Sequence, residues 1–148
     1  MPTRKATAEW KGGFKRGSGT FRAESGRFSG DYTTGTRFGD DAGTNPEELL
    51  AAAQASCFSQ ALALALEQDG TPAELIRTEA RCTIEKQGDG YAITRMALHV
   101  RARVPGADED RFVELAEQMK VGCPVSKALR NNVQLELDAA LEQAAPTG

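Results

Sequence analysis

The sequence has only one histidine, three cysteines and no long uninterrupted apolar run. A single histidine excludes a histidine-rich metal site, and the cysteines lie too far apart for the Cys-x-x-Cys spacing of a zinc site. The longest apolar stretch, residues 49–66, contains two glutamines and two serines, which favours a buried helix over a membrane span. Without a ligand set or a glycine-rich phosphate loop, the sequence predicts no metal, haem, flavin or nucleotide cofactor.

No excess of charge of one sign is present either. The chain has 18 Lys and Arg against 21 Asp and Glu, with both signs spread along its length, so we expect no nucleic-acid partner. Residues 1–5 run into polar sequence and not into the apolar segment of an export signal, and we expect no membrane association. Three cysteines in such a chain indicate a reducing cytoplasm, where a disulfide is transient and catalytic.

The pattern along the chain predicts a single α+β domain over residues 1–148. Residues 1–42 predict a β-hairpin arm, with strands and turns over 4–38; the arm has few apolar residues and needs a partner surface to cover it. Residues 45–70 predict a long central helix, and residues 71–148 a second half of two strands, two helices and a strand. Two main helices would pack against a mostly antiparallel sheet, and the tail would fray.

Signals at both ends define the central helix. Asn45 is the expected N-cap, Pro46 occupies the first helical position, and Glu48 is spaced for a capping box. Gly70 is the expected stop. The middle of this helix is apolar on nearly every face and rich in alanine, which indicates burial on all sides. Because a chain of 148 residues has little material to surround such a helix, the sequence predicts an intimate homodimer.

Among the residues able to do chemistry, Cys123 has the clearest local signal. It directly precedes Pro124 at a helix start, so it occupies the N-cap, where free N–H groups and the helix dipole stabilise a thiolate. Taken alone, Cys57 has the features of a small core residue, and Cys82 belongs to the inward face of an alternating strand. His99 lies on an outward face, and with no second histidine a protease-type Cys-His nucleophile is poorly supported.

Two long motifs resemble those of the OsmC/Ohr family. Residues 43–59, GTNPEELLAAAQASCFS, resemble its first cysteine motif, and residues 122–129, GCPVSKAL, resemble its second. The likeness covers nearly the whole chain and is closer to the OsmC branch than to the Ohr branch. It extends through Trp10 and residues 15–17, 24–26, 36–38 and 104–106.

This resemblance implies an OsmC-like fold, an intertwined two-subunit assembly and a thiol-dependent peroxidase of oxidative or osmotic stress defence. Cys57 would be the peroxidatic cysteine, which reduces organic hydroperoxides, with hydrogen peroxide as a further substrate, and becomes a sulfenic acid. Cys123 would be the resolving cysteine, which forms a disulfide with Cys57 before over-oxidation. An external dithiol would then reduce that disulfide. Two rival functions share these features: a redox sensor, and a dimer that binds a small apolar ligand with idle cysteines.

By the same resemblance, Arg37 supplies the positive charge that a peroxidatic thiolate needs, and Glu47 holds the arginine in place. The Ohr branch takes its arginine from an earlier strand, so Arg16 and Arg22 are alternatives. Ten residues of helix separate Glu47 from Cys57, or about 15 Å. Either the helix is broken near its start, or Arg37 and Glu47 reach the thiol of the other subunit.

The resemblance and simple electrostatics disagree on one point. The helix dipole favours Cys123 as the more ionised thiol, whereas the resemblance makes Cys57 the attacking one. We follow the resemblance, because an adjacent guanidinium can outweigh a helix end worth about 1 kcal/mol. The chain also departs from many family members at Gln54, where they have histidine or tyrosine, and we expect this change to tune the pocket.

Overall fold

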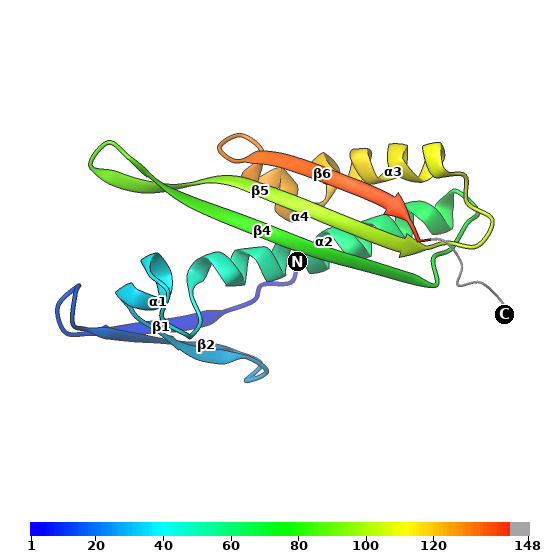
Figure 1. Ribbon diagram of the computed structural model, residues 1–148. Coiled ribbons are helices and arrows are strands. Elements are labelled where there is room, and N and C mark those ends of the chain that lie inside the picture. The colour runs from blue at the N-terminus through cyan, green and yellow to red at the C-terminus, as the bar shows by residue number, and fades with distance from the viewer. Residues whose placement is uncertain (143–148) are drawn as a thin grey trace, which may run out of the picture. The chain divides into compact units, whose positions relative to one another are not determined.

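The structure is a computed structural model and describes residues 1–142, so the tail expected to fray lies largely outside the described residues. Its elements follow the order βββ-α-α-ββ-α-α-β, and this α+β architecture confirms the expected fold class (Figure 1). The chain divides into two compact units, an N-terminal unit of residues 1–49 and a C-terminal unit of residues 50–148. The single domain expected from the sequence stays a prediction.

The N-terminal unit contains a three-stranded antiparallel sheet. Its strands β1 (Ala6–Lys11), β2 (Ser18–Ala23) and β3 (Ser29–Tyr32) are hydrogen bonded in chain order. Ala23 is the one apolar side chain of this unit that belongs to the buried core. This arm therefore has few buried apolar side chains, and the large aromatic side chains of Phe14 and Phe28, which lie between its strands, are exposed.

A short helix, α1 (Thr34–Phe38), follows β3, where the sequence was expected to form only strands and turns. That expectation is wrong for these five residues, because Thr33 caps the helix. The Thr33 hydroxyl accepts a hydrogen bond from the Thr36 N–H at 3.2 Å, and the Thr36 hydroxyl accepts one from the Thr33 N–H at 2.9 Å. This reciprocal capping box satisfies two donors that would otherwise have no partner.

Helix α2 (Pro46–Gln68) is one element of 23 residues. The Asn45 side chain accepts a hydrogen bond from the Glu48 N–H at 2.8 Å, which confirms Asn45 as the N-cap. Gly70, with a φ of 89°, follows the helix in the left-handed conformation that glycine adopts without strain. By length and composition alone α2 could cross a membrane, a test that the core helix of a soluble protein also passes.

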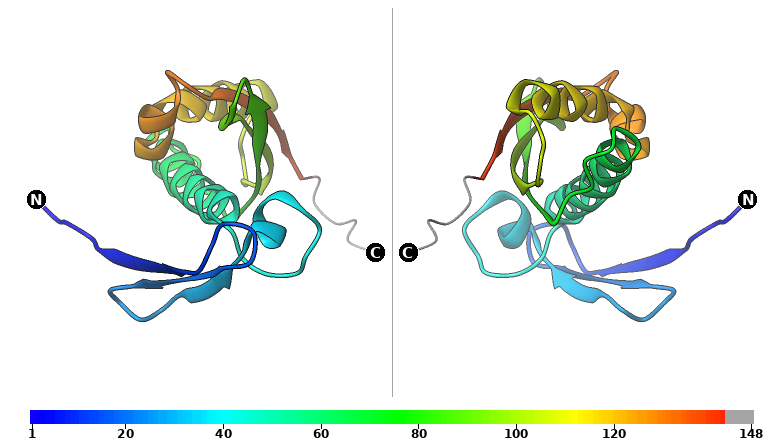
Figure 2. Two further views of the ribbon diagram at one scale, coloured as in Figure 1. Left: turned by 90° about the vertical axis from the view of Figure 1, so that its left-hand side faces the viewer. Right: turned by 90° about the vertical axis from the view of Figure 1, so that its right-hand side faces the viewer.

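The C-terminal unit is built on a second three-stranded sheet. Strands β4 (Leu75–Gln87) and β5 (Gly90–Arg103) form the expected antiparallel hairpin, and β6 (Gln134–Leu141) pairs with β5 in parallel. The β5–β6 crossover passes through α3 (Glu109–Gly122) and α4 (Pro124–Leu129). In this unit α2 and α3 lie on the same face of the sheet (Figure 2).

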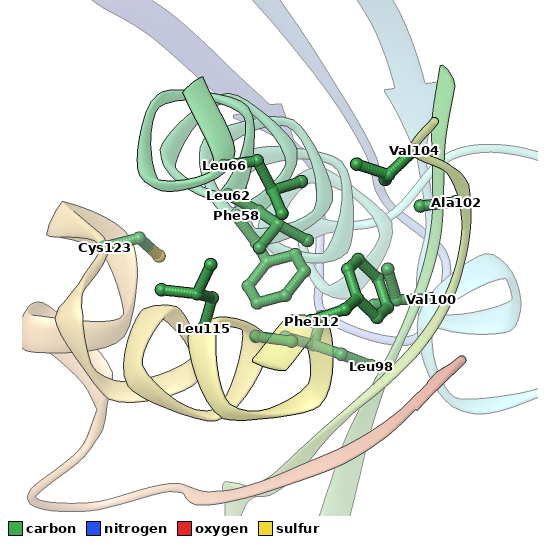
Figure 3. Close-up of a cluster of buried hydrophobic side chains, with 11 residues drawn as sticks. Phe58, Leu62, Leu66, Leu98, Val100, Ala102, Val104, Phe112, Leu115 and Cys123 are labelled. Atoms are coloured by element: carbon green, nitrogen blue, oxygen red, sulfur yellow. The ribbon is translucent and has the colours of Figure 1, made fainter. Parts of the chain in front are cut away.

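The hydrophobic core lies between that sheet face and the helices (Figure 3). Each fully buried large apolar side chain contributes about 1.5–3 kcal/mol. Helix α2 contributes a stripe at intervals of four residues, Phe58, Leu62 and Leu66, all with no exposed surface. The other buried members come from β5 and the crossover: Leu98, Val100, Ala102, Val104, Phe112, Leu115, Ala116 and Cys123.

Candidate functional site

Cys57 and Cys123, the two cysteines that the sequence singles out, both lie in the C-terminal unit. Cys57 lies in the middle of α2, one residue before the buried Phe58, and its thiol is half-buried. Cys123 lies at the junction of α3 and α4 and is only 1% exposed. Both are free thiols, and they lie close enough that the Cys123 side chain raises the pKa of Cys57. The fold thus brings together two thiols that are 66 positions apart in the sequence, while their predicted roles stay predictions.

Three influences act on the acidity of Cys57. Burial is the largest and raises the pKa of the thiol above its ordinary value of 9.0. The Val125 backbone N–H donates a hydrogen bond to the sulfur, which lowers the pKa, while the neighbouring Cys123 thiol raises it. The net effect is a raised pKa. Cys57 thus needs a further positive charge if it is to act as a thiolate at neutral pH.

The start of α4 corrects the expectation that its free N–H groups would serve Cys123. Cys123 does occupy the N-cap, with φ −68° and ψ 151°, but its side chain makes no capping hydrogen bond. The N–H of Val125, the second residue of that helix, instead donates to the sulfur of Cys57. This backbone donor partly opposes the effect of burial at the thiol that the resemblance makes the attacking one, although the pKa of Cys57 is still raised overall.

A buried polar network surrounds Cys123. The Gln54 Nε2 group donates to the Ser126 hydroxyl at 2.8 Å and lies 3.7 Å from the Cys123 sulfur. The Ser126 hydroxyl is also 3.1 Å from that sulfur. Gln54 and Ser126 have no exposed surface. In the sequence, Gln54 stands out only as a departure from the family pattern, and the sole signal for Ser126 is its place three residues after Cys123.

The charged residues expected beside the thiol form a pair in the N-terminal unit. Arg37 donates from Nε to Glu47 Oε1 at 3.1 Å and from Nη2 to the same oxygen at 3.0 Å. Glu47 is 6% exposed, and the Arg37 guanidinium lies 5.2 Å from the centre of the Phe38 ring. The rival arginines, Arg16 and Arg22, are exposed. The expected Arg37–Glu47 contact is thus present, while its role at Cys57 stays a prediction.

Two elements hold this charge pair. Arg37 lies on α1, and Glu47 is in the first turn of α2. The Asn45 side-chain amide donates to the Thr36 carbonyl oxygen at 3.1 Å, while its oxygen caps α2. One side chain therefore joins the two helices at the point where the guanidinium meets the carboxylate. The pair is partly desolvated, which strengthens its charge-assisted hydrogen bonds.

The remaining candidates lie elsewhere. His99 is on the exposed face of β5, as expected, with Nδ1 3.3 Å from Asp138 Oδ2. Cys82 is half-buried on β4, where it pairs in register with Met96. Within residues 1–142, no group of three or more His, Cys, Asp and Glu is placed to hold a metal ion.

This fold, with a thiol pair between a long helix and the start of a short one, corresponds to a known family of proteins. Residues 39–138 match the family model described as OsmC-like protein, and the chain belongs to that family. Peroxiredoxin OsmC of Escherichia coli strain K12 is 42% identical over 134 residues, which cover 90% of this chain and 94% of that protein. Organic hydroperoxide resistance protein-like 2 of Staphylococcus epidermidis is 35% identical, covering 67% and 69% of the two chains.

Solved structures show the same fold. The organic hydroperoxide resistance protein OhrB of Bacillus subtilis superimposes with a TM-score of 0.71 at 28% identity, covering 95% of this chain and 98% of that one. An OsmC-like protein from Mycoplasma pneumoniae gives a TM-score of 0.74 at 16% identity, covering 96% and 99%. At that low identity the second likeness concerns the fold alone.

Proposed function

We propose that this chain is a cysteine-based peroxidase that reduces organic hydroperoxides through a Cys57 sulfenic acid and a Cys57–Cys123 disulfide. The observation that supports this most directly is the proximity of two free thiols, one on α2 and one at the start of α4, which the effect of Cys123 on the pKa of Cys57 reflects. Relatives named peroxiredoxin and organic hydroperoxide resistance protein support the same reaction class. The apolar side chains around the thiols, such as Phe58 and Met119, favour organic peroxides.

The reaction has three balanced steps. The Cys57 thiolate attacks the distal oxygen of ROOH; the O–O bond breaks, and the alkoxide takes up a proton and leaves as ROH. The Cys123 sulfur then attacks the Cys57 sulfenic sulfur, forming the S–S bond and expelling hydroxide, which becomes water on protonation. An external dithiol reduces the disulfide by thiol–disulfide exchange and restores both thiols.

The Arg37–Glu47 pair supplies the activating charge in this proposal. Burial raises the pKa of Cys57, and a guanidinium opposes this effect by stabilising the thiolate and the charge that develops on the departing oxygen. Glu47 accepts from both Nε and Nη2 of Arg37, so the guanidinium is held in one orientation. Holding the cation in place limits the reorganisation that the reaction requires.

We further propose that this cation acts on Cys57 of a second subunit. Helix α2 runs as one element from Pro46 to Gln68, so the alternative of a break near its start is not found. Ten residues of helix keep Glu47 about 15 Å from Cys57 of the same chain. Helix α2 also keeps apolar side chains exposed, including Leu64 at 55%, which a second copy in a cytoplasmic homodimer would cover.

Peroxide consumption by single-cysteine variants tests the proposed chemistry. With a dithiol reductant in excess, Cys57→Ser should consume no cumene hydroperoxide. Cys123→Ser should complete one stoichiometric reaction and then over-oxidise at Cys57, visible by mass spectrometry as sulfinic and sulfonic acids. The matched control is Cys82→Ser, which should turn over like the wild type. Equal activity in all four proteins would refute the mechanism.

A mixed dimer tests whether the charge and the thiol come from different chains. Arg37→Met and Cys57→Ser homodimers should each have little or no activity. In a co-expressed mixed dimer, one of the two sites would combine Arg37 of one subunit with Cys57 of the other, so purified mixed dimers should recover about half of the wild-type activity per dimer. No recovery would show that both groups act within one chain.

A further inference from the structure

The polar network around Cys123 has no assigned task in the reaction described so far. Gln54, Ser126 and Cys123 together have almost no exposed surface, yet each has a polar or polarisable group at the centre of the cluster. Burying such groups is unfavourable unless they are satisfied. One of them is not: Gln54 Oε1 is buried and has no hydrogen-bond partner within the part of the chain that the structure describes. This unfavourable arrangement requires a reason.

The orientation of the Gln54 amide explains why its oxygen is left without a partner. Its Nε2 group faces both the Ser126 oxygen and the Cys123 sulfur, at 2.8 and 3.7 Å. Because the Ser126 oxygen accepts from Gln54, its own proton is available to the sulfur 3.1 Å away. Two donors therefore converge on Cys123. Turning the amide by half a rotation would give Ser126 an acceptor instead and remove both donors from the sulfur.

We propose that Gln54 and Ser126 form a donor pair that stabilises the Cys123 thiolate during disulfide exchange, an inference that rests on the proposed function. In the resolving step, ionised Cys123 attacks the Cys57 sulfenic sulfur. Donors directed at this sulfur stabilise the negative charge that it carries as the attacking thiolate, so the reaction is faster. The orientation that places the Gln54 Nε2 group beside Ser126 and Cys123 leaves Oε1 without a partner, and this is the energetic cost of the arrangement.

The difference in exposure between the two cysteines sets the direction of disulfide reduction, and the donor pair assists it. Cys123 is 1% exposed, whereas Cys57 is half-buried, so the thiolate of an external dithiol has better access to the Cys57 sulfur. That attack forms a mixed disulfide with Cys57, breaks the S–S bond and releases Cys123 as a thiolate. The second thiol of the reductant then frees Cys57. A leaving thiolate that receives two hydrogen bonds departs faster.

Two variants separate this role from simple packing. Ser126→Ala removes the hydroxyl, and Gln54→Met keeps the side-chain length but removes both the donors and the unsatisfied Oε1. In the full-length protein, mixed with one equivalent of cumene hydroperoxide, loss of the Cys57 thiol should proceed within about twofold of the wild-type rate. Disulfide formation, followed by quenching and mass spectrometry, should slow about threefold to tenfold. Excess peroxide should then over-oxidise Cys57.

Controls distinguish the possible outcomes. Ser59→Ala removes a comparable hydrogen bond, Ser59 to Thr78 at 2.7 Å, and should leave both rates unchanged. Gln54→Met should keep or raise the thermal midpoint while it slows resolution, which a purely structural role would not do; it also decides the matter if Ser126→Ala does not fold. Equal slowing of both steps, or wild-type disulfide formation in the variants, would overturn the donor pair. Failure of wild-type Cys57 to oxidise would instead overturn the proposed function and this inference with it.

Discussion

The N-terminal and C-terminal units differ both in what holds them together and in what they offer to the chemistry. The C-terminal unit has a core of eleven buried residues and contains both reacting thiols. In the N-terminal unit, Ala23 is the one core residue, and the functional feature is the Arg37–Glu47 pair. The well-packed unit thus positions the sulfurs, while the sparsely packed one holds a charge on short helical segments and hydrogen-bonded caps.

This difference indicates that stability and reactivity respond to different substitutions. Tight packing limits the positions of the two cysteine side chains, because a core tolerates few alternative rotamers. A charge pair can be oriented with less packing, because two helices joined by the Asn45 side chain are enough to hold the guanidinium. Substitutions in the C-terminal core should therefore act mainly on folding, and substitutions in the charge pair mainly on rate.

The largest effect should come from the core of the C-terminal unit. Leu62 has no exposed surface, so Leu62→Ala should lower the free energy of unfolding by about 2–5 kcal/mol through lost burial and a cavity. Denaturant unfolding at fixed protein concentration measures this. The control in the other unit is Phe28→Ala, which is 54% exposed and should cost less than about 1 kcal/mol. Comparable losses would show that the two units are packed alike.

The next effect concerns the charge pair. In Arg37→Met, the rate of Cys57 with peroxide at pH 7 should fall about 100-fold. Burial raises the pKa of Cys57 above 9.0, so without the cation the thiolate fraction is small at pH 7. The rate should then rise about tenfold per pH unit toward pH 9, whereas the wild type should be nearly flat around neutrality. Stopped-flow pH profiles of Arg37→Met against Arg22→Met check this; a steep profile only for Arg22→Met would move the role to that residue.

The smallest effect should come from a surface ion pair of the C-terminal unit. Hydrogen bonds from the Arg111 guanidinium hold the pKa of Asp69 below its ordinary value of 3.8. A carboxyl with a lowered pKa in the folded state adds stability above its unfolded pKa and loses it as the pH falls through the folded one. Asp69→Asn should thus lower the thermal midpoint by about 1–3 °C at pH 7 in low salt. The difference should close below pH 3.8.

The counterpart in the N-terminal unit is Glu24→Gln. The Glu24 carboxylate lies 3.0 Å from the Lys5 ammonium, and both side chains are more than half exposed. Its removal should leave the thermal midpoint unchanged. A larger shift for Glu24→Gln than for Asp69→Asn would contradict the ranking of the two units.

Local signals account for the parts of the fold that the sequence predicted. The ends of α2 are defined by residues next to them in the sequence: Asn45 as N-cap, Pro46 at the first position, and Gly70 in the left-handed conformation after the last turn. The β4–β5 hairpin follows from alternation and from the glycines at its turn. Helix α1 was not predicted although its cap, Thr33, is a local signal. A helix of five residues is too short to stand out from the strand pattern around it.

Other features depend on residues that only the fold brings together. Gln54 and Ser126 are 72 positions apart, so no spacing rule predicts their hydrogen bond. The sequence placed Cys123 at a helix start, but it did not reveal that the N–H of Val125 would donate to Cys57. The residues alone made Arg37 and Glu47 a candidate pair but favoured two surface charges, and the family resemblance singled the pair out.

The hydrogen bond from Val125 to Cys57 also sets an order in time. Val125 follows Cys57 by 68 residues, which a ribosome adds in about 3–14 s at 5–20 residues per second. Throughout that interval the nascent Cys57 lacks both its backbone donor and Cys123. Cys57 therefore precedes its proposed resolving partner by 66 residues, and a chain oxidised at Cys57 during that interval has no Cys123 with which to form the disulfide.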